Sequence, residues 1–185
     1  MARTPSNMLP LGTALPEAIL PDVDGSAVHL AEQTGERGLL VMFICNHCPF
    51  VIHIAPALHN IIARVRQQGF GVVAINANDP VAYPADAPDR MGDFLAQYQL
   101  DIPYLFDETQ SVAKAFDAAC TPDFYLFDAQ HRLVYRGQLD DSRPGNDVPV
   151  SGADLLAAAA EVAAGKAPAA DQKPSLGCNI KWRDS

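Results

Sequence analysis

Apolar runs and helically spaced apolar positions alternate through the first half of the chain. Residues 39–44 and 70–75 are apolar without alternation, which is typical of central strands that are covered on both faces. Between them, apolar residues keep helical spacing from Pro49 to Gln68, and Gly69 follows where a helix cap belongs. This strand-helix-strand order predicts a parallel βαβ unit with a right-handed crossover.

Shorter patterned segments flank this unit. Residues 13–30 predict a hairpin of two short strands around an Asp-Gly turn, as an N-terminal extension of the core. An Ala-rich helix is expected over 151–164, with Ser151 as its N-cap and Asp154 at the spacing of a capping box. Residues 76–90 are expected to form an irregular loop. The remaining predicted elements are helices at 91–100 and 109–116, a short strand at 104–106, and a hairpin of strands 123–127 and 132–136.

Length and composition suit one globular domain. The chain has 185 residues, of which 49% are hydrophobic and 19% are charged. We expect a single domain over residues 1–185, with a core at about 12–164 and a tail at 165–185 that shows no periodicity. The net charge of −9 argues against nucleic acid or an anionic membrane as a partner.

The N-terminal thirty residues are broken by four prolines and contain no apolar run long enough for a signal peptide or a membrane span. We therefore expect a cytoplasmic protein. Because thiols are kept reduced in that compartment, the four cysteines are expected to be catalytic or sensing rather than a permanent disulfide framework.

Two cysteines separated by two residues directly follow the first apolar run. Cys45 and Cys48 bracket an Asn-His pair, and Pro49 stands where the fixed φ of proline suits the first helical position. Unpaired backbone N–H groups and the positive end of the helix dipole stabilise a thiolate at such a helix start. Cys-x-x-Cys spacing also lets the second sulfur resolve a mixed disulfide formed by the first. The motif therefore predicts a redox-active dithiol.

The cysteine pair is also compatible with two roles outside redox chemistry. It can be half of a structural zinc site, although Cys120 and Cys178 lie far apart in sequence and provide no second closely spaced pair. It can also be a pair of inert buried thiols, because free cysteine is often part of a protein core. The strand-turn-helix context favours the redox interpretation, and we expect neither a bound metal nor another cofactor.

The order of elements and four motifs resemble the thioredoxin-like superfamily, in particular its peroxiredoxin-like branch (alkyl hydroperoxide reductase/thiol-specific antioxidant, or redoxin). The resemblance covers about residues 12–164 and implies an α/β fold: a three-layer sandwich with a mixed central sheet, helices on both faces and an N-terminal hairpin extension. The motifs look like those of an uncharacterised subfamily, and they are Cys-Asn-His-Cys-Pro-Phe at 45–50, Cys-Thr-Pro-Asp-Phe at 120–124, Tyr-Arg-Gly-Gln-Leu-Asp-Asp at 135–141 and Gly-Cys-Asn-Ile-Lys-Trp at 177–182.

The resemblance also implies roles for individual residues. Cys45 is expected to be the attacking thiol and Cys48 the resolving one, with Pro49 as a supporting residue. The bond between Thr121 and Pro122 is expected to be cis and to present the Thr121 backbone to a bound peptide or thiol. The alternative is that Pro122 is an ordinary strand-edge proline.

The chain departs from its relatives at functional positions. Thioredoxins carry a buried acid six residues before the first cysteine, where this chain has Leu39. Asp79 and Asp123 are candidate substitutes, although a solvated or turn-capping role also accounts for each of them. Peroxiredoxins carry a threonine where this chain has Cys45, and their peroxide-polarising arginine, expected near 120–123, is missing. Because little then stabilises charge on a leaving oxygen, dithiol exchange is favoured over peroxide reduction.

The leading hypothesis is thus a thiol-disulfide oxidoreductase, an enzyme whose partners are a protein or small-molecule disulfide or thiol and a cellular reductant. His47 between the cysteines is expected to favour the thiolate and make the couple more oxidising, unless it only faces solvent. One alternative is a thiol-dependent peroxidase of the antioxidant type, with peroxide as substrate. The other is a soft-metal protein that holds copper through Cys45, Cys48 and His47.

The tail carries the only tryptophan of the chain, together with two aliphatic residues and a cysteine. A solvated tail gains nothing from such side chains, so we expect it to pack on the domain through Ile180 and Trp182. A second redox pair between Cys120 and Cys178 is a further hypothesis, and it requires Cα atoms within about 7 Å of each other.

Overall fold

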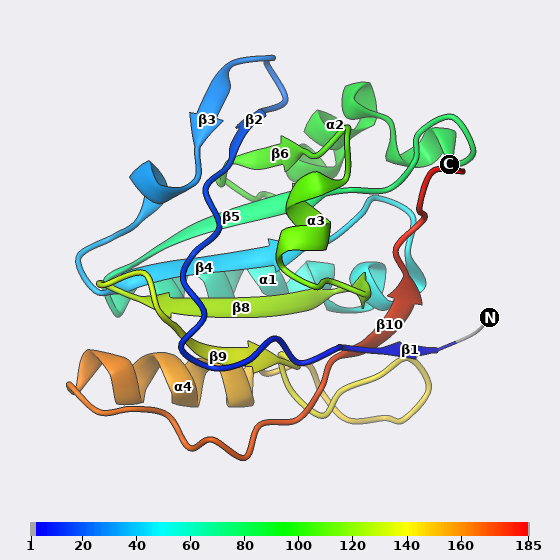
Figure 1. Cartoon of the computed structure of the whole chain (residues 1–185). Helices are drawn as coiled ribbons and strands as arrows, with labels where there is room; N and C mark the ends of the chain where they lie inside the picture. Colours follow the sequence, from blue (N-terminus) through cyan, green and yellow to red (C-terminus); the bar gives the residue numbers. More distant parts are fainter. Residues whose placement is uncertain (1–2, 185) are drawn as a thin grey trace.

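A five-stranded mixed sheet forms the centre of the computed structural model, which describes residues 3–184 (Figure 1). Its strand order is β6-β5-β4-β8-β9. The two neighbours of β4 run in opposite directions, because β5 pairs with it in parallel and β8 pairs with it antiparallel. The strands are β4 (Gly38–Phe43), β5 (Phe70–Asn76), β6 (Tyr104–Phe106), β8 (Asp123–Asp128) and β9 (Leu133–Gly137).

Helices cover both faces of this sheet (Figure 1). One apolar cluster packs α1 (Pro49–Gln67), α2 (Pro88–Tyr98) and α4 (Ala153–Ala163) against one face. A second cluster packs α3 (Ser111–Ala115) and the N-terminal segment against the other. Every residue of β4 is buried, as expected of a central strand between two apolar layers. The α/β class, the mixed sheet and the three layers of a thioredoxin-like fold are confirmed.

The hairpin expected near the N-terminus consists of β2 (Ile19–Pro21) and β3 (Ala27–His29), which pair antiparallel. Two short 3-10 helices complete the connections, η1 (Ala31–Gln33) and η2 (Pro84–Asp86). The second of these lies inside the segment expected to be an irregular loop. Among the described residues, no helix is both long enough and apolar enough to cross a membrane.

The tail contributes a strand of its own. Strand β10 (Leu176–Asn179) pairs antiparallel with β1 (Thr4–Pro5) on one side and with β7 (Cys120–Thr121) on the other. Ile180 is buried in the apolar cluster on the α3 face, whereas the side chain of Trp182 remains 41% exposed. The expected docking of the tail is therefore confirmed at Ile180, while Trp182 is only partly covered.

The capping box expected at α4 is wrong. Gly152 is the N-cap, with a φ of 71°, and the Asp154 carboxylate accepts a hydrogen bond from the Gln138 side chain at 2.6 Å instead of turning back to the helix start. Asp140, from the loop after β9, accepts the backbone N–H groups of Ser151 and Gly152 at 2.8 and 2.7 Å. The Ser151 hydroxyl does accept the backbone N–H of Ala153 at 3.2 Å, as expected of a local cap. The N–H groups of Asp154 and Leu155 bond to the carbonyl group of Leu139, a contact from a distant loop that helical spacing alone does not reveal.

Candidate active site

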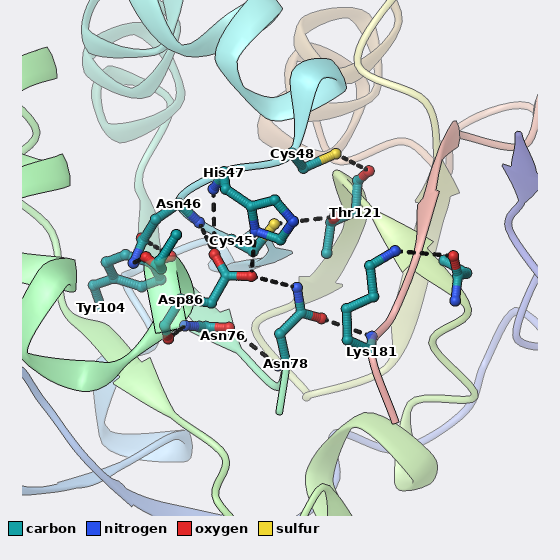
Figure 2. Close-up of polar contacts among 12 residues, drawn as sticks. Cys45, Asn46, His47, Cys48, Asn76, Asn78, Asp86, Tyr104, Thr121 and Lys181 are labelled. Carbon is teal, nitrogen blue, oxygen red and sulfur yellow. Dashed lines mark hydrogen bonds and ion pairs between the residues drawn. The ribbon is translucent and has the colours of Figure 1, made fainter. Parts of the chain in front are cut away.

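Strand β4 and helix α1 place the two cysteines of the motif at one edge of the sheet (Figure 2). Cys45 follows the end of β4, and Cys48 is the N-cap of α1, with Pro49 as the first helical residue. Both cysteines are free thiols, and each is only 1% exposed. Neither sulfur is therefore favoured over the other by access to solvent.

The two thiols share a hydrogen bond and titrate as a pair. The bond to Cys48, burial and the nearby negative charge of Asp86 raise the pKa of Cys45 well above its usual value. The bond from Cys45 lowers the pKa of Cys48 to about 5, against the opposing effect of burial. The backbone N–H of Val51 at the helix start also favours the Cys48 thiolate. A negative charge in the reduced pair is therefore favoured on Cys48 over Cys45.

A buried carboxylate holds the turn between the cysteines. Asp86, in η2, is fully buried and accepts the backbone N–H groups of Asn46 at 2.7 Å and His47 at 3.2 Å. Its second oxygen accepts the side-chain amide of Asn78 at 2.8 Å, and the Tyr104 hydroxyl donates to the Asn46 side chain (Figure 2). The conformation of the Cys-x-x-Cys turn is therefore fixed by a segment that lies about forty residues further along the chain.

Asp86 is also the acid that the sequence does not single out. Its carboxylate, the Cys45 sulfur and a ring nitrogen of His47 all lie within 4.8 Å of one another. The two acids proposed as substitutes for the thioredoxin carboxylate have other partners. Asp79 accepts the backbone N–H of Val81 in its own loop, and Asp123 accepts the hydroxyls of Ser6 and Tyr125.

His47 is held against Asp86 and Tyr83 rather than pointing freely into solvent. Its Nδ1 atom lies 2.5 Å from Asp86 Oδ2, a contact that is an ion pair when the ring is protonated. The ring stacks on Tyr83, with centroids 5.6 Å apart and planes inclined by 14°. Within residues 3–184, Cys45, His47 and Asp86 are the one group whose donor atoms come close enough together to hold a metal ion. The contact between His47 and Asp86, together with the position of Cys45 at the start of the same turn, also accounts for their closeness without a metal ion.

The turn before β8 faces the dithiol, as the resemblance implied. The peptide bond between Thr121 and Pro122 is cis. The Thr121 hydroxyl lies 3.6 Å from the Cys45 sulfur, and its carbonyl oxygen lies 3.4 Å from the Cys48 sulfur, where it accepts a hydrogen bond whenever that thiol is protonated. Thr121 therefore contacts both sulfurs of the pair.

Cys120 and Cys178 do not form the second pair that the sequence suggests. In the β7–β10 pairing Cys178 lies opposite Thr121, whereas Cys120 lies opposite Asn179. Since side chains alternate between the faces of a strand, Cys178 shares the face of Thr121 and Cys120 points to the other face. Cys178 instead forms a hydrogen bond with Cys48, a contact between distant segments that no local sequence signal indicates.

Comparison with known proteins finds two solved structures that are similar to the chain over nearly its whole length. The chain shares 47% identity with the crystal structure of an uncharacterized conserved protein of Geobacillus kaustophilus, with a TM-score of 0.97 over 100% of this chain and 98% of that one. It shares 49% identity with a hypothetical protein of Sinorhizobium meliloti 1021, with a TM-score of 0.95 over 98% of this chain and 100% of that one. These two likenesses extend over the tail as well as the core.

A curated relative carries a functional name. The thiol-disulfide oxidoreductase ResA of Halalkalibacterium halodurans is 24% identical over 116 residues, which make up 63% of this chain and 61% of that protein. The chain thus spans about three fifths of the length of this relative. The family described as Redoxin matches residues 10–155, a range that contains the dithiol, Asp86 and the Thr121-Pro122 turn. The chain therefore belongs to the Redoxin family, and its relatives support a redox function.

Proposed function

We propose that the protein is a thiol-disulfide oxidoreductase in which Cys45 and Cys48 cycle between a dithiol and a disulfide. The observation that carries the proposal is the hydrogen bond between the two thiols at the start of α1, which favours a thiolate on one of them. A thiolate is the attacking species in disulfide exchange, and a neighbouring thiol is what releases the product. The named activity of the ResA relative supports the same reaction class.

The charge distribution favours Cys48 as the attacking sulfur. The sequence predicts the opposite division of roles, with Cys45 attacking, and that prediction relies on the order of the cysteines in related motifs. Here the N-cap position belongs to Cys48, while the carboxylate of Asp86 disfavours a negative charge on Cys45. We therefore assign attack to Cys48 and resolution to Cys45.

The proposed cycle consists of two exchanges. The Cys48 thiolate attacks one sulfur of a substrate disulfide, the substrate S–S bond breaks, and the other substrate sulfur leaves as a thiolate. Cys45 then gives up its proton and attacks the Cys48 sulfur, which releases the second substrate thiol and leaves the Cys45–Cys48 disulfide. His47 and Asp86 lie within reach of the Cys45 sulfur and are the groups able to take its proton. A cellular dithiol reductant restores the reduced pair.

Exposed apolar side chains beside the motif favour a protein disulfide as the substrate. Ile52 in the first turn of α1 is exposed, and so are Val81 and Tyr83 in the loop that covers His47. Apolar groups that border a reactive pair give a polypeptide something to pack against. The acidic character of the chain, with a net charge of −9, favours neutral or basic segments of that partner.

Stopped-flow mixing of the reduced protein with oxidised glutathione, beside hydrogen peroxide, tests the reaction class. We expect oxidation of the wild-type protein by the disulfide, with loss of both motif thiols, and a much slower reaction with peroxide. Rapid oxidation by peroxide together with inertness to the disulfide would overturn the proposal in favour of a peroxidase.

Single cysteine variants test the roles of the two sulfurs. After exposure to oxidised glutathione, Cys48 of the Cys45→Ser variant should carry glutathione or a disulfide formed when another thiol displaces that glutathione. The Cys48→Ser variant should react slowly. Mass spectrometry of tryptic peptides locates the adduct, and Cys120→Ser serves as the control because its thiol faces away from the site. A fast adduct on Cys45 in the Cys48→Ser protein would restore the order that the sequence predicts.

A further inference from the structure

A third thiol reaches the dithiol from the C-terminal tail. Strand β10 lies against the Thr121-Pro122 turn, and it places Cys178 directly opposite Thr121. The Thr121 side chain contacts Cys45, and its carbonyl group contacts Cys48. Because directly opposed residues of an antiparallel pair point to the same face, the Cys178 side chain is directed to the face on which the dithiol lies.

The approach of β10 to this turn is close and depends on a glycine. A Cβ atom on Gly177 would lie 2.0 Å from the carbonyl oxygen of Thr121 and 3.3 Å from a ring carbon of Pro122. No side chain is compatible with that spacing, so Gly177 allows the strand to lie directly on the turn. The backbone therefore holds the next residue, Cys178, at a fixed place beside the site.

Cys178 meets Cys48 at the first turn of α1. The two thiols are hydrogen-bonded, and the backbone N–H of Phe50 faces Cys178 as that of Val51 faces Cys48. Cys178 is buried in the same apolar cluster as Cys45 and Cys48. Cys48 thus has a thiol neighbour on two sides, one from its own motif and one from the tail.

We propose that Cys178 is a third redox-active thiol, which bonds to Cys48 as an alternative to Cys45. The proposal rests on the dithiol exchange described above and extends it. In the exchange, the Cys178 thiolate attacks the Cys48 sulfur of the Cys45–Cys48 disulfide. A Cys48–Cys178 bond forms, the Cys45–Cys48 bond breaks, and Cys45 leaves as a thiolate that takes up a proton, with no net oxidation or reduction. By the same attack on the Cys48 sulfur, Cys178 breaks a mixed disulfide between Cys48 and a substrate and releases the substrate as a thiolate.

Oxidation of Cys48 itself prepares Cys178 for this step. Burial is the main cause that raises the pKa of Cys178, to about 12, and the thiolate of Cys48 adds to it through their hydrogen bond and its negative charge. When Cys48 enters a disulfide, that charge is lost. The Phe50 N–H and the Lys181 ammonium, which both favour a Cys178 thiolate, remain. The third thiol is thus protonated while the site is reduced and becomes more acidic once Cys48 is oxidised.

The Cys45→Ser variant isolates the new pair, because it leaves Cys178 as the only thiol next to Cys48. After treatment with oxidised glutathione, we expect a disulfide that joins tryptic peptide 38–64 to peptide 167–181. The double variant Cys45→Ser/Cys178→Ser should instead retain glutathione on Cys48. The matched control Cys45→Ser/Cys120→Ser should form the cross-linked peptide as readily as Cys45→Ser, because Cys120 lies on the opposite face of β7.

Persistence of the glutathione adduct on Cys48 in Cys45→Ser, with Cys178 still free to be alkylated, would overturn the proposal. The outcome is separable from the proposed function, because failure of the latter appears as an inert Cys45–Cys48 pair in the wild-type protein.

A purely structural role is tested with Cys178→Ser and Cys178→Ala. The hydroxyl of serine keeps a hydrogen-bond donor beside Cys48, so only the alanine variant should raise the pKa of Cys48, whereas both should abolish the cross-linked peptide in the oxidised protein. In the wild-type protein, peptide mapping after oxidation should find both the Cys45–Cys48 and the Cys48–Cys178 bond. Detection of the Cys45–Cys48 bond alone would contradict the proposed role of Cys178. As a check on the assay, the same mapping of the unfolded protein should show that Cys178 can be oxidised.

Discussion

At the scale of single residues, the reactivity of the dithiol depends on one carboxylate. Asp86 carries a negative charge close to the Cys45 sulfur and at the same time accepts the backbone N–H groups of the Asn46-His47 turn. The first effect raises the pKa of Cys45, and the second holds the turn in place. Asparagine at this position keeps an oxygen for the two N–H groups but removes the charge, so the two effects can be separated.

We expect Asp86→Asn to lower the pKa of Cys45, because the neighbouring negative charge that disfavours its thiolate is gone. The measurement is the pH dependence of alkylation by iodoacetamide in a Cys48→Ser background, where Cys45 is the remaining motif thiol. Asp79→Asn is the matched control, because the Asp79 carboxylate caps its own loop at Val81. If Asp79→Asn shifts the alkylation profile and Asp86→Asn does not, Asp86 is not the acid that raises the pKa of Cys45.

His47 gives a second prediction at this scale. A ring nitrogen of His47 lies within 4.8 Å of the Cys45 sulfur and 2.5 Å from Asp86, so a positive imidazole offsets the Asp86 charge beside the dithiol and stabilises its reduced form. We expect His47→Gly to make the couple more reducing, by about 30 mV for each tenfold change in the equilibrium constant. Equilibration against glutathione buffers measures the potential, with the exposed His59→Ala as control. An unchanged potential would show that His47 does not affect the redox equilibrium of the dithiol.

The motif residues can be predicted from the sequence because their chemistry is local. A strand, a turn and a proline-initiated helix lie within one stretch of chain, so the spacing of Cys45 and Cys48 is enough to place them. Asp86 is one acid among several in a loop, and Cys178 is a single cysteine in a tail. Their proximity to the dithiol is created by tertiary packing, which neither hydrophobic periodicity nor motif spacing describes.

At the scale of elements, the long apolar patterns predict the correct helices and strands, and errors arise where distant groups intervene. Strands β4 and β5 and helix α1 lie within one or two residues of their predicted bounds. The predicted capping box of α4 is wrong because the Asp154 carboxylate binds the Gln138 side chain, and the carbonyl group of Leu139 accepts two of the first helical N–H groups. The tail strand β10 is not predicted as a strand, since four residues are too few to show alternation.

The docking of the tail can be tested through its two largest apolar residues. Ile180→Ala should destabilise the protein by about 2–5 kcal/mol, because it leaves a cavity in the cluster on the α3 face. Trp182→Ala should cost less, since the indole is 41% exposed. Urea denaturation followed by circular dichroism compares the two free energies of unfolding. Equal losses, or a larger loss for Trp182, would mean that the tail is anchored at its end.

At the scale of the whole molecule, a buried polar cluster ties both ends of the chain to the central sheet. Ser6, beside β1, donates its hydroxyl to the Asp123 carboxylate at 2.8 Å, and the backbone N–H of Ser175, just before β10, donates to the Ser6 hydroxyl at 2.8 Å. Tyr125 donates to the second oxygen of Asp123 at 3.0 Å. The strand that carries Cys178 is thus connected to β8 through a single buried carboxyl group.

This cluster makes the stability of the fold depend on pH. Burial raises the pKa of Asp123 from 3.8 to about 7, although hydrogen bonds from Ser6, Tyr125 and the Phe124 N–H oppose the shift. The folded protein therefore holds the Asp123 proton more tightly than the unfolded chain does. The associated stabilisation is fully present below the unfolded pKa and is lost as the pH rises through the folded value.

We expect Asp123→Asn to remove this contribution, because the amide does not titrate. Relative to wild type, the free energy of unfolding of the variant should rise between about pH 4 and pH 7 and stay level above that window. Urea denaturation at a series of pH values measures the difference, and Asp101→Asn, an exposed carboxylate, is the control. If the free energies of unfolding of wild type and variant instead change in parallel between about pH 4 and pH 7, the Asp123 carboxyl group is ionised throughout that range. The cluster then joins the chain ends through a buried negative charge and not through a protonated carboxyl group.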